Sequence, residues 1–423
     1  MKRKIQYIWF IAILNITGLF AQETFNVMFY NLLNFPLEDA VPNRLQYLET
    51  ILDDYQPDVF MVCELNNESG ANSILNLIQN TINPNFEKAN FTLNSSDDTI
   101  GNQNDLQNLL YYDSSKFILE SQNIVTTIFR DFNHYRLKLN TINQDTEPIF
   151  IDFIVCHLKA SSGEDNQELR LEMVEDLIIY LENFPADSNV ILAGDFNVYT
   201  SSEPAFQRLI DNTNNIVFID PANQIGSWHN NTNYIDVFTQ STRTQTGMGG
   251  TTGGFDDRFD FIMCSENMIN DTDVYYASDS YQAYGNNGNI DCYNNAINDT
   301  ECDGATFSFE IRDALHNFSD HLPVTLQIET TETLLSTPEH NNGSLFEIVG
   351  TNIVKSNIRV KFNNQSNHTK RLIIYDVLGH TVKTVAINSS YEYTIPIAGL
   401  SSGIYYIMPF NTHVEPLKFV KIN

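Results

Sequence analysis

The sequence predicts an α/β domain followed by a small β-sandwich. Over most of the chain, short β-branched apolar runs alternate with segments whose apolar residues recur at helical spacing, which is typical of strands and helices packed in layers. Over the last part the pattern changes to short strands separated by turn residues. With 423 residues and 42% hydrophobic content, the chain is long enough to fill a core in each part.

The elements of the first part can be placed in chain order. Thr24–Asn31 is expected to be a strand, and Arg44–Tyr55 a helix that stops at Pro57. Leu169–Phe184 is the clearest amphipathic helix, and it leads directly into the strand of Val190–Asn197. This alternation of strands and helices supports the α/β class.

Five segments, spread over roughly three hundred residues, place polar side chains at the end of an apolar run or in a short motif. They are Phe25–Asn31, Val59–Glu64, Ile151–His157, Val190–Asn197 and Ser319–His321. An unpaired carboxylate is costly to bury, so such groups must face a cleft, a cation or a partner. A single acid at the end of a strand could be explained as a turn cap. The five segments together contain every part that a metal-dependent phosphoryl hydrolase needs.

These motifs resemble those of the endonuclease/exonuclease/phosphatase superfamily, which includes DNase I-like nucleases, sphingomyelinases and inositol phosphatases. The matching segments, in the family's order, are Tyr30-Asn31, Glu64, His157-Leu-Lys-Ala160, Gly194-Asp-Phe-Asn197, Arg258-Phe-Asp-Phe-Ile262 and Ser319-Asp-His-Leu-Pro-Val324. The resemblance covers about Thr24 to Glu329. It implies a four-layer α/β/β/α sandwich (DNase I-like) with the site at one end of two packed sheets.

The resemblance also implies a role for each site residue. Glu64 is expected to bind Mg²⁺ or Mn²⁺, because a carboxylate is a hard ligand for a hard ion, with Asn31 and Asp320 completing the metal end. Asp195 would orient or deprotonate the attacking water, and Asn197 would hold a phosphate oxygen. The remaining expected roles are phosphate contact or proton transfer by His321, control of its tautomer by Asp260, and protonation of the leaving group by His157.

We therefore expect a secreted metal-dependent phosphoesterase, most simply a nuclease acting on extracellular DNA or RNA. A phosphomonoesterase or a sphingomyelinase-like phospholipid phosphodiesterase is the alternative within enzymes, since it would share the core and differ in its rim loops. A catalytically silent surface adhesin is the alternative from another class, but a module kept for binding need not retain the whole residue set.

The net charge is −30, and it is unevenly distributed. Residues 331–423 hold eight Lys/Arg and six Asp/Glu, and residues 2–4 hold three cations, which leaves 12 basic and 47 acidic side chains in residues 22–330. That domain is therefore near −35. Polyanion binders normally show a basic footprint, so this charge disfavours tight DNA binding unless metal ions offset it. Solubility is the simpler explanation.

The two ends of the chain predict export. Residues 1–21 have a basic start and an apolar run from Ile5 to Phe20, which predicts a signal peptide; a membrane anchor is the alternative, although the run is short for a bilayer span. Apart from this run we expect no membrane span, and the mature protein is expected to be a monomer that is secreted or attached to the cell surface.

Domain boundaries follow from composition. Residues 22–330 form the expected catalytic domain, 331–345 a Thr/Ser/Pro/Asn-rich linker, and 346–423 a small β-sandwich. The tail resembles the C-terminal sorting domain of type IX secretion substrates, on the segments Leu372–Val382, Gly399–Tyr406 and Phe419–Asn423, which implies the secretion machinery as a partner. A carbohydrate-binding or adhesive module is the alternative.

Two further features leave alternatives open. Cys292 and Cys302 flank an Asn/Asp-rich loop and are candidates for a disulfide in an exported protein. The acids of this loop are a candidate structural Ca²⁺ site, with solvated acids as the alternative; they are Asp291, Asp299, Glu301 and Asp303. In the expected strand Asn133–Leu139 one face carries a stripe of three basic side chains, which either contacts a phosphate or is solvated; they are His134, Arg136 and Lys138.

Overall fold

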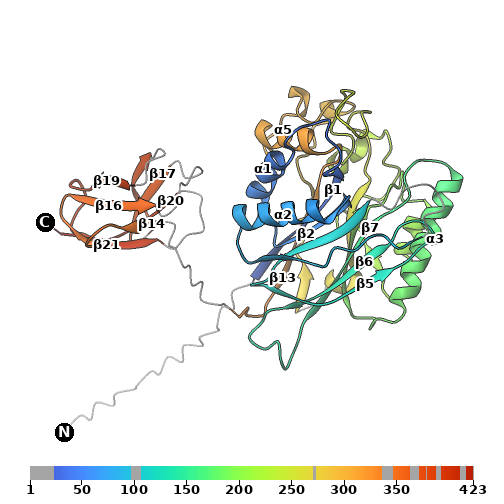
Figure 1. Cartoon of the computed structure of the whole chain (residues 1–423), viewed down its shortest axis with the longest axis horizontal. Coiled ribbons are helices and arrows are strands. Elements are labelled where there is room, and N and C mark those ends of the chain that lie inside the picture. The colour runs from blue at the N-terminus through green and yellow to red at the C-terminus, as the bar shows by residue number, and fades with distance from the viewer. Residues whose placement is uncertain are drawn as a thin grey trace, which may run out of the picture. The chain divides into compact units, whose positions relative to one another are not determined.

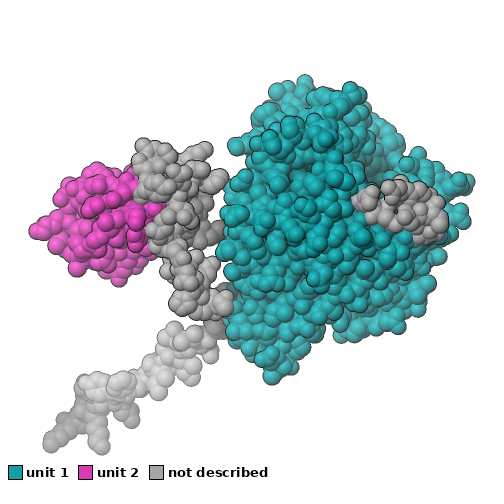
Figure 2. Space-filling model, viewed as in Figure 1, with its two compact units in different colours: residues 1–335 teal, residues 336–423 magenta. Residues whose placement is uncertain are grey.

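The computed structural model describes residues 23–96, 106–269, 273–335, 346–362, 371–377, 379–386, 392–409 and 416–422. The signal peptide expected at residues 1–21 and most of the expected linker lie outside these ranges. The chain divides into two compact units, residues 1–335 and 336–423, which Figure 2 shows in different colours. Among the described residues, no helix has the length and apolar character that crossing a membrane requires.

The first unit is built on two mixed sheets. Sheet A has the strand order β11-β13-β1-β2-β4-β3, with β12 also paired to β13. Its strands are β1 (Glu23–Phe35), β2 (Val59–Leu65), β3 (Phe86–Lys88), β4 (Gln107–Asp113), β11 (Val274–Tyr276), β12 (Gln282–Ala283) and β13 (Val324–Thr330). Sheet B has the order β5-β6-β7-β8-β10-β9. Its strands are β5 (Phe117–Val125), β6 (Phe132–Leu139), β7 (Phe150–His157), β8 (Asn189–Asp195), β9 (Phe218–Ile219) and β10 (Asp260–Ser265).

Helices cover the outer face of each sheet, as Figure 1 shows for α1, α2 and α5 over sheet A and for α3 beside sheet B. The helices are α1 (Leu45–Tyr55), α2 (Glu68–Thr81), α3 (Glu164–Leu181), α4 (Pro204–Leu209) and α5 (Phe309–Phe318). Four short 3-10 helices complete the unit: η1 (Thr232–Val237), η2 (Glu266–Ile269), η3 (Ile290–Cys292) and η4 (Thr300–Cys302). The four-layer α/β/β/α sandwich expected from the sequence is therefore confirmed.

The two sheets pack face to face through their apolar side chains. Phe25 of β1 and Phe117 of β5 contact each other across the interface, with ring centroids 5.0 Å apart. A second apolar cluster joins sheet B to α3 through Met173, Val174 and Leu177. Helix α3 begins at Glu164, five residues before the predicted start, because acidic side chains in a first turn interact favourably with the helix dipole.

Strand register places the ends of the central strands of sheet B side by side. In the parallel pair β7–β8, His157 is opposite Asp195. In the antiparallel pair β8–β10, Asp195 is opposite Asp260. Side chains at paired positions point to the same face of a sheet, so these three residues form a row across it.

The basic side chains of the β6 stripe all contact acidic side chains. His134 is buried and contacts Asp152 and the Tyr180 hydroxyl. Arg136 donates two hydrogen bonds to the same carboxylate, at 2.7 and 2.9 Å, and Lys138 pairs with Glu120. Each basic side chain is therefore matched by an acid, so the stripe is not a plainly solvated face, and its contact with a phosphate stays a prediction.

The second unit consists of two small sheets. One has the order β14-β16-β19 and the other β15-β21-β20-β17-β18. The strands are β14 (Phe346–Ile348), β15 (Ile353–Val354), β16 (Asn357–Phe362), β17 (Arg371–Asp376), β18 (Thr381–Ala386), β19 (Glu392–Pro396), β20 (Gly403–Pro409) and β21 (Leu417–Lys421). Both sheets contribute to a separate apolar core that includes Ile358, Ile374, Ile395 and Ile407. This is the small β-sandwich that the sequence predicts.

The Cys292–Cys302 loop is held by a disulfide and by the side chain of Arg312. The two cysteines are bonded, with their Cα atoms 4.5 Å apart. Arg312 of α5 pairs with Asp303 and donates to the carbonyl oxygens of Ile297 and Asp299. Within the described ranges, no three of the loop's acids come together as a possible metal site. A structural Ca²⁺ ion at this loop stays a prediction.

Candidate active site

The five polar segments converge at one end of the two sheets. The Asn31 amide nitrogen lies 3.1 Å from Glu64 Oε1, 3.1 Å from Asp195 Oδ2 and 3.5 Å from His321 Nε2. Asn31 thus touches residues from β2, from β8 and from the segment before β13. The structure brings all eight residues of the sequence-predicted site into this region: Asn31, Glu64, His157, Asp195, Asn197, Asp260, Asp320 and His321.

Two site residues adopt left-handed backbone conformations where their strands end. Glu64 has φ of 55° and Asn197 has φ of 52°. Such angles cost free energy for residues with a Cβ and are seen mostly where surrounding contacts enforce them. Here the Glu64 carboxylate accepts from the Asn34 amide at 3.0 Å, and the Asn197 amide donates to Asp195 Oδ1 at 3.1 Å. The turn at each strand end directs the side chain into the site.

His321 is fixed in orientation and charge by Asp260. Its Nδ1 lies 2.7 Å from Asp260 Oδ2, and its Nε2 lies 3.9 Å from Asp195 Oδ2. Burial disfavours the charged imidazole, yet the carboxylates of Asp260 and Asp320 raise the pKa of His321 well above its usual value. These carboxylates favour the charged form of the ring.

His157 has the opposite electrostatic character. Its Nε2 lies 3.6 Å from Asp195 Oδ2 and 3.9 Å from Glu64 Oε1. Burial, together with the nearby charges of Arg130 and His321, holds the pKa of His157 well below its usual value. The pKa values of the two histidines thus shift in opposite directions, because only His321 has a hydrogen-bonded carboxylate behind it.

The pKa values of two carboxyl groups in the centre are raised, so their ionised forms are disfavoured. Burial, partly opposed by His321, raises the pKa of Asp195 to about 7. Burial and the neighbouring Asp320 also raise the pKa of Glu64. A carboxylate whose pKa lies near the working pH can accept a proton during catalysis and release it again before the next turnover. Asp195 meets that condition.

The donor set fits a hard divalent cation. Ligand atoms of Glu64, His157 and Asp195 lie within 4.8 Å of one another, and so do those of Asp195, Asp260 and His321. In the described part of the chain, three buried atoms of the site have no hydrogen-bond partner: His157 Nδ1, Asp260 Oδ1 and Asp320 Oδ1. Buried carboxylate oxygens without a donor favour a cation nearby. Asp320 belongs to neither group, and its other oxygen accepts from the Thr251 amide at 2.7 Å.

Sequence reasoning missed three residues that shape the site. The Gln240 amide nitrogen lies 2.6 Å from His321 Nε2 and 3.4 Å from Asp320 Oδ2. Arg130 donates to the Leu158 carbonyl at 3.1 Å, and its charge acts on Glu64 and Asp195. Ser319 donates to the Asn31 carbonyl at 2.8 Å, whereas its motif drew attention only to the acid and histidine beside it. Gln240 and Arg130 lie in loops and follow no apolar run, so no periodic signal marks them.

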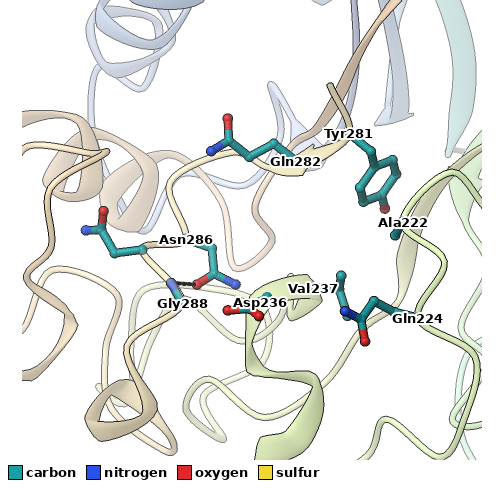
Figure 3. A pocket seen from close by; sticks show the side chains of 9 residues that line it. Ala222, Gln224, Asp236, Val237, Tyr281, Gln282, Asn286 and Gly288 are labelled. Atoms are coloured by element: carbon teal, nitrogen blue, oxygen red, sulfur yellow. Dashed lines mark hydrogen bonds between the residues drawn. The ribbon is translucent and has the colours of Figure 1, made fainter. Parts of the chain in front are cut away.

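A separate hollow of roughly 300 Å³ lies away from this centre, and Figure 3 shows the side chains around it. Four amide side chains line it, together with Asp236, Tyr281, Val237 and two small residues. Asn286 makes hydrogen bonds to the carbonyls of Ile235 and Phe238. None of the eight site residues lines this hollow, so it is distinct from the candidate active site.

Comparisons with solved structures give fold-level likenesses at low identity. The human nocturnin catalytic domain with bound sulfate is 15% identical, with a TM-score of 0.45 and coverage of 72% of this chain and 94% of that one. An endonuclease/exonuclease/phosphatase from Bacteroides vulgatus is 14% identical, with a TM-score of 0.46 and coverage of 73% and 99%. D. rerio TDP2 complexed with a single-strand DNA product is 14% identical, with a TM-score of 0.45 and coverage of 73% of this chain and 99% of that one. No curated protein matches the chain.

Family comparisons assign both units. Residues 352–415 match the family described as secretion system C-terminal sorting domain. That match indicates export by type IX secretion, to the cell surface or beyond it. Residues 25–321, which are more than half of the chain and contain the whole candidate site, match the endonuclease/exonuclease/phosphatase family. The chain therefore belongs to the endonuclease/exonuclease/phosphatase family and is a phosphoric ester hydrolase.

Proposed function

We propose that the first unit is a divalent-metal-dependent phosphodiesterase and that its substrate is extracellular nucleic acid. The observation that carries this proposal is the convergence of Glu64, His157 and Asp195, with Asp195 Oδ2 3.6 Å from His157 Nε2 and 3.9 Å from His321 Nε2. Burial raises the pKa of Asp195 to about 7, so a base that can take a proton near neutral pH lies beside a histidine whose charged form is favoured. This pair suits attack of water on an anionic phosphorus centre. Phosphodiesters resist hydrolysis because water is a poor nucleophile and the departing alkoxide carries charge.

Each side chain has a defined part in this mechanism. Asp195 orients the attacking water and takes its proton, while Asn197 holds a non-bridging phosphate oxygen through its amide. His321, whose charged form Asp260 favours, attracts the phosphate. His157 is neutral before the substrate arrives, but an anionic phosphate beside it raises the imidazole pKa. It can then give a proton to the leaving alkoxide.

Glu64 is the principal residue that would hold the metal, with Asn31 and Asp320 beside it. Mg²⁺ or Mn²⁺ suits this oxygen-rich set, and such an ion would supply Lewis-acid stabilisation of charge on the phosphate and leaving group. Glu64 Oε1 lies 3.9 Å from His157 Nε2. The residues proposed for metal binding and for leaving-group protonation are therefore adjacent.

A small-molecule or lipid phosphoester is the second candidate, and the charge of the domain favours it. The chain carries −30 overall, which repels a DNA polyanion over long distances at low ionic strength. A short or neutral-headed phosphodiester meets much less repulsion. Phosphomonoesters and sphingomyelin-like lipids remain in this class. A silent adhesin is disfavoured, because the family match assigns the chain to the phosphoric ester hydrolases.

The deciding experiment is a substrate panel on the purified protein with Mg²⁺ or Mn²⁺ added. Plasmid DNA, RNA, nucleotides, bis(p-nitrophenyl) phosphate and sphingomyelin are compared, with the Glu64→Gln protein as control. We expect backbone cleavage of DNA or RNA. Release of phosphate or phosphocholine with both nucleic acids left intact would replace the nuclease by the second candidate. Salt adds a check: DNA cleavage should rise from very low to moderate monovalent salt, opposite to basic binders.

Export completes the proposal. We propose that residues 1–21 are removed as a signal peptide, that residues 22–330 are the catalytic domain, and that residues 346–423 serve as the sorting domain. The type IX machinery is then the partner of the second unit. Mass spectrometry of the mature protein from culture medium and from washed cells would give both termini and distinguish a released from an attached form.

A further inference from the structure

A second group of metal-binding side chains lies outside the catalytic centre. Ligand atoms of His229, Asp256 and Asp257 are all within 4.8 Å of one another. His229 Nδ1 lies 2.6 Å from Asp257 Oδ1, and the His229 side chain is 45% exposed, so solvent can reach the group. None of these three residues follows a strand of the catalytic row, and none takes part in the proposed hydrolysis.

Backbone pairing places this group on the same face as the catalytic centre. Gln240 forms antiparallel bridges with His321 on one side and with Asp257 on the other. The Gln240 amide donates to the Asp257 carbonyl at 3.0 Å, and the Asp257 amide donates back at 2.9 Å. Bridged residues point to one face and their Cβ atoms are roughly 5 Å apart. Asp257 therefore lies about 10 Å from His321, on the same face.

A second set of contacts fixes the group from the other side. Tyr199, two residues after Asn197, packs its ring against His229 with centroids 5.2 Å apart. The Tyr199 amide donates to Glu203 at 2.8 Å, and Glu203 is paired with the buried Arg170. His229 is thus connected to the centre in two ways: through Tyr199 to Asn197, and through Asp257 and Gln240 to His321. It forms part of the rim that a substrate longer than one phosphoester would meet.

Among the described residues, no hydrogen-bond donor reaches the carboxylate of Asp256 to stabilise its negative charge. Burial and the neighbouring Asp257 raise the pKa of Asp256 to about 6. The other ring nitrogen, His229 Nε2, lies 2.6 Å from the Asn230 side-chain nitrogen, and the Asn230 side-chain oxygen accepts from the Tyr293 hydroxyl at 3.0 Å. These contacts leave Nδ1 as the ring nitrogen that faces the carboxylates. One imidazole nitrogen with two carboxylates is a donor set for Zn²⁺ or Mn²⁺ rather than for Ca²⁺.

We propose that His229, Asp256 and Asp257 form a second divalent-cation site on the rim of the active centre, with a preference for Zn²⁺ or Mn²⁺. A bound divalent ion neutralises the group, because its two positive charges offset the two carboxylates of Asp256 and Asp257. An anionic chain that leaves the catalytic centre on the Asn197 side then meets a neutral rather than a negative rim. The site is a binding property of this chain and does not depend on the proposed nuclease activity.

Ion counting on the full-length protein tests the proposal without any activity assay. Equilibrium dialysis against Zn²⁺ and against Mn²⁺ gives the number of ions bound per chain. We expect His229→Ala and Asp256→Asn to bind one ion fewer than the wild type, and Glu64→Gln to keep the rim ion. His380→Ala is the matched control, since His380 is an exposed histidine 3.3 Å from Asp376 without a second carboxylate in a metal-binding group. It should bind as many ions as the wild type.

A donor exchange separates loss of a ligand from loss of structure. His229→Asp turns the set into oxygen donors only, so we expect one rim ion still to bind while Zn²⁺ affinity falls and Ca²⁺ affinity rises by about tenfold or more. Melting curves confirm that each variant is folded. The proposal is overturned if His229→Ala and Asp256→Asn bind as many ions as the wild type, or if His229→Asp leaves the Zn²⁺ preference unchanged.

Discussion

The catalytic centre and the Arg170–Glu203 pair are two buried clusters of charge in the same unit, and they are organised differently. Arg170 and Glu203 are almost fully buried, with side chains 0% and 1% exposed. Every nitrogen of the guanidinium has a partner: Glu203, or the carbonyls of Lys159 and Ser161. The catalytic centre instead keeps buried oxygens without donors at Asp260 and Asp320.

This difference separates a structural cluster from a chemical one. A buried charge with all its partners holds backbone in place, and Arg170 here anchors the loops that follow His157 and Asn197. A buried charge without partners is costly. It persists where a ligand completes it. The two clusters should therefore respond differently to substitution, pH and truncation.

Glu64→Gln should have the largest effect, and on turnover alone. We expect hydrolysis of bis(p-nitrophenyl) phosphate with Mg²⁺ to fall by about a thousandfold or more. The melting temperature of the metal-free protein should stay equal or rise, since a costly buried charge is removed. Initial rates and melting curves measure both. EDTA should abolish wild-type activity, and EDTA-resistant hydrolysis would rule out the metal mechanism.

Arg170→Met should have the opposite profile. The change leaves the Glu203 carboxylate buried without its cation, so we expect the free energy of unfolding to fall by about 3–5 kcal/mol. Turnover of the folded fraction at low temperature should change far less than in Glu64→Gln. Urea unfolding measures the first quantity. The double variant Arg170→Met/Glu203→Leu should regain part of the loss, and a wild-type stability for Arg170→Met would contradict the contrast.

The stability of the metal-free protein should fall as the pH rises, because the catalytic centre contains Asp195 with a raised pKa. The folded pKa of Asp195 is about 7, above the unfolded value of about 3.9. The folded protein therefore holds the proton more tightly, and the cost of ionising Asp195 grows from about pH 4 to pH 7. In metal-free protein, stability relative to Asp195→Asn should fall over that window by a few kcal/mol, roughly 1.4 kcal/mol per pKa unit. Added Mg²⁺ should reduce the fall; a pH-independent difference would refute the assigned shift.

Removing the second unit should have the smallest effect. Residues after Leu335 have their own apolar core, and both charge clusters lie within residues 1–335. We expect a protein truncated after Leu335 to keep kcat/KM on bis(p-nitrophenyl) phosphate within about twofold, as for an independent domain. Steady-state kinetics on both proteins test this. A large rise in KM on truncation would instead assign substrate recruitment to the second unit.

The parts of the fold that could be predicted are those with a periodic signal. The strands that carry Glu64, His157 and Asp195 at or next to their last residue follow from apolar runs that stop at a polar residue. Helix α1 follows from helical spacing before Pro57. The start of α3 was misplaced by five residues because its first turn is polar and carries no apolar period.

Contacts between loops could not be predicted. Gln240 reaches His321 only because the segment around it pairs with two others, and no local pattern encodes that pairing. The rim group has the same origin, since His229 and Asp257 are 28 residues apart in sequence. The basic stripe of β6 shows the converse: its period was correct, but the acids that neutralise it lie on β5 and β7.

The left-handed turns at Glu64 and Asn197 have a consequence for the sequences this fold tolerates. At φ of 55° and 52°, glycine is the residue that relaxes the backbone, so selection for yield alone should enrich glycine at positions 64 and 197 over alanine. Selection for hydrolysis should restore glutamate and asparagine. Comparing the two enriched libraries by sequencing would show, position by position, where this chain trades foldability for turnover.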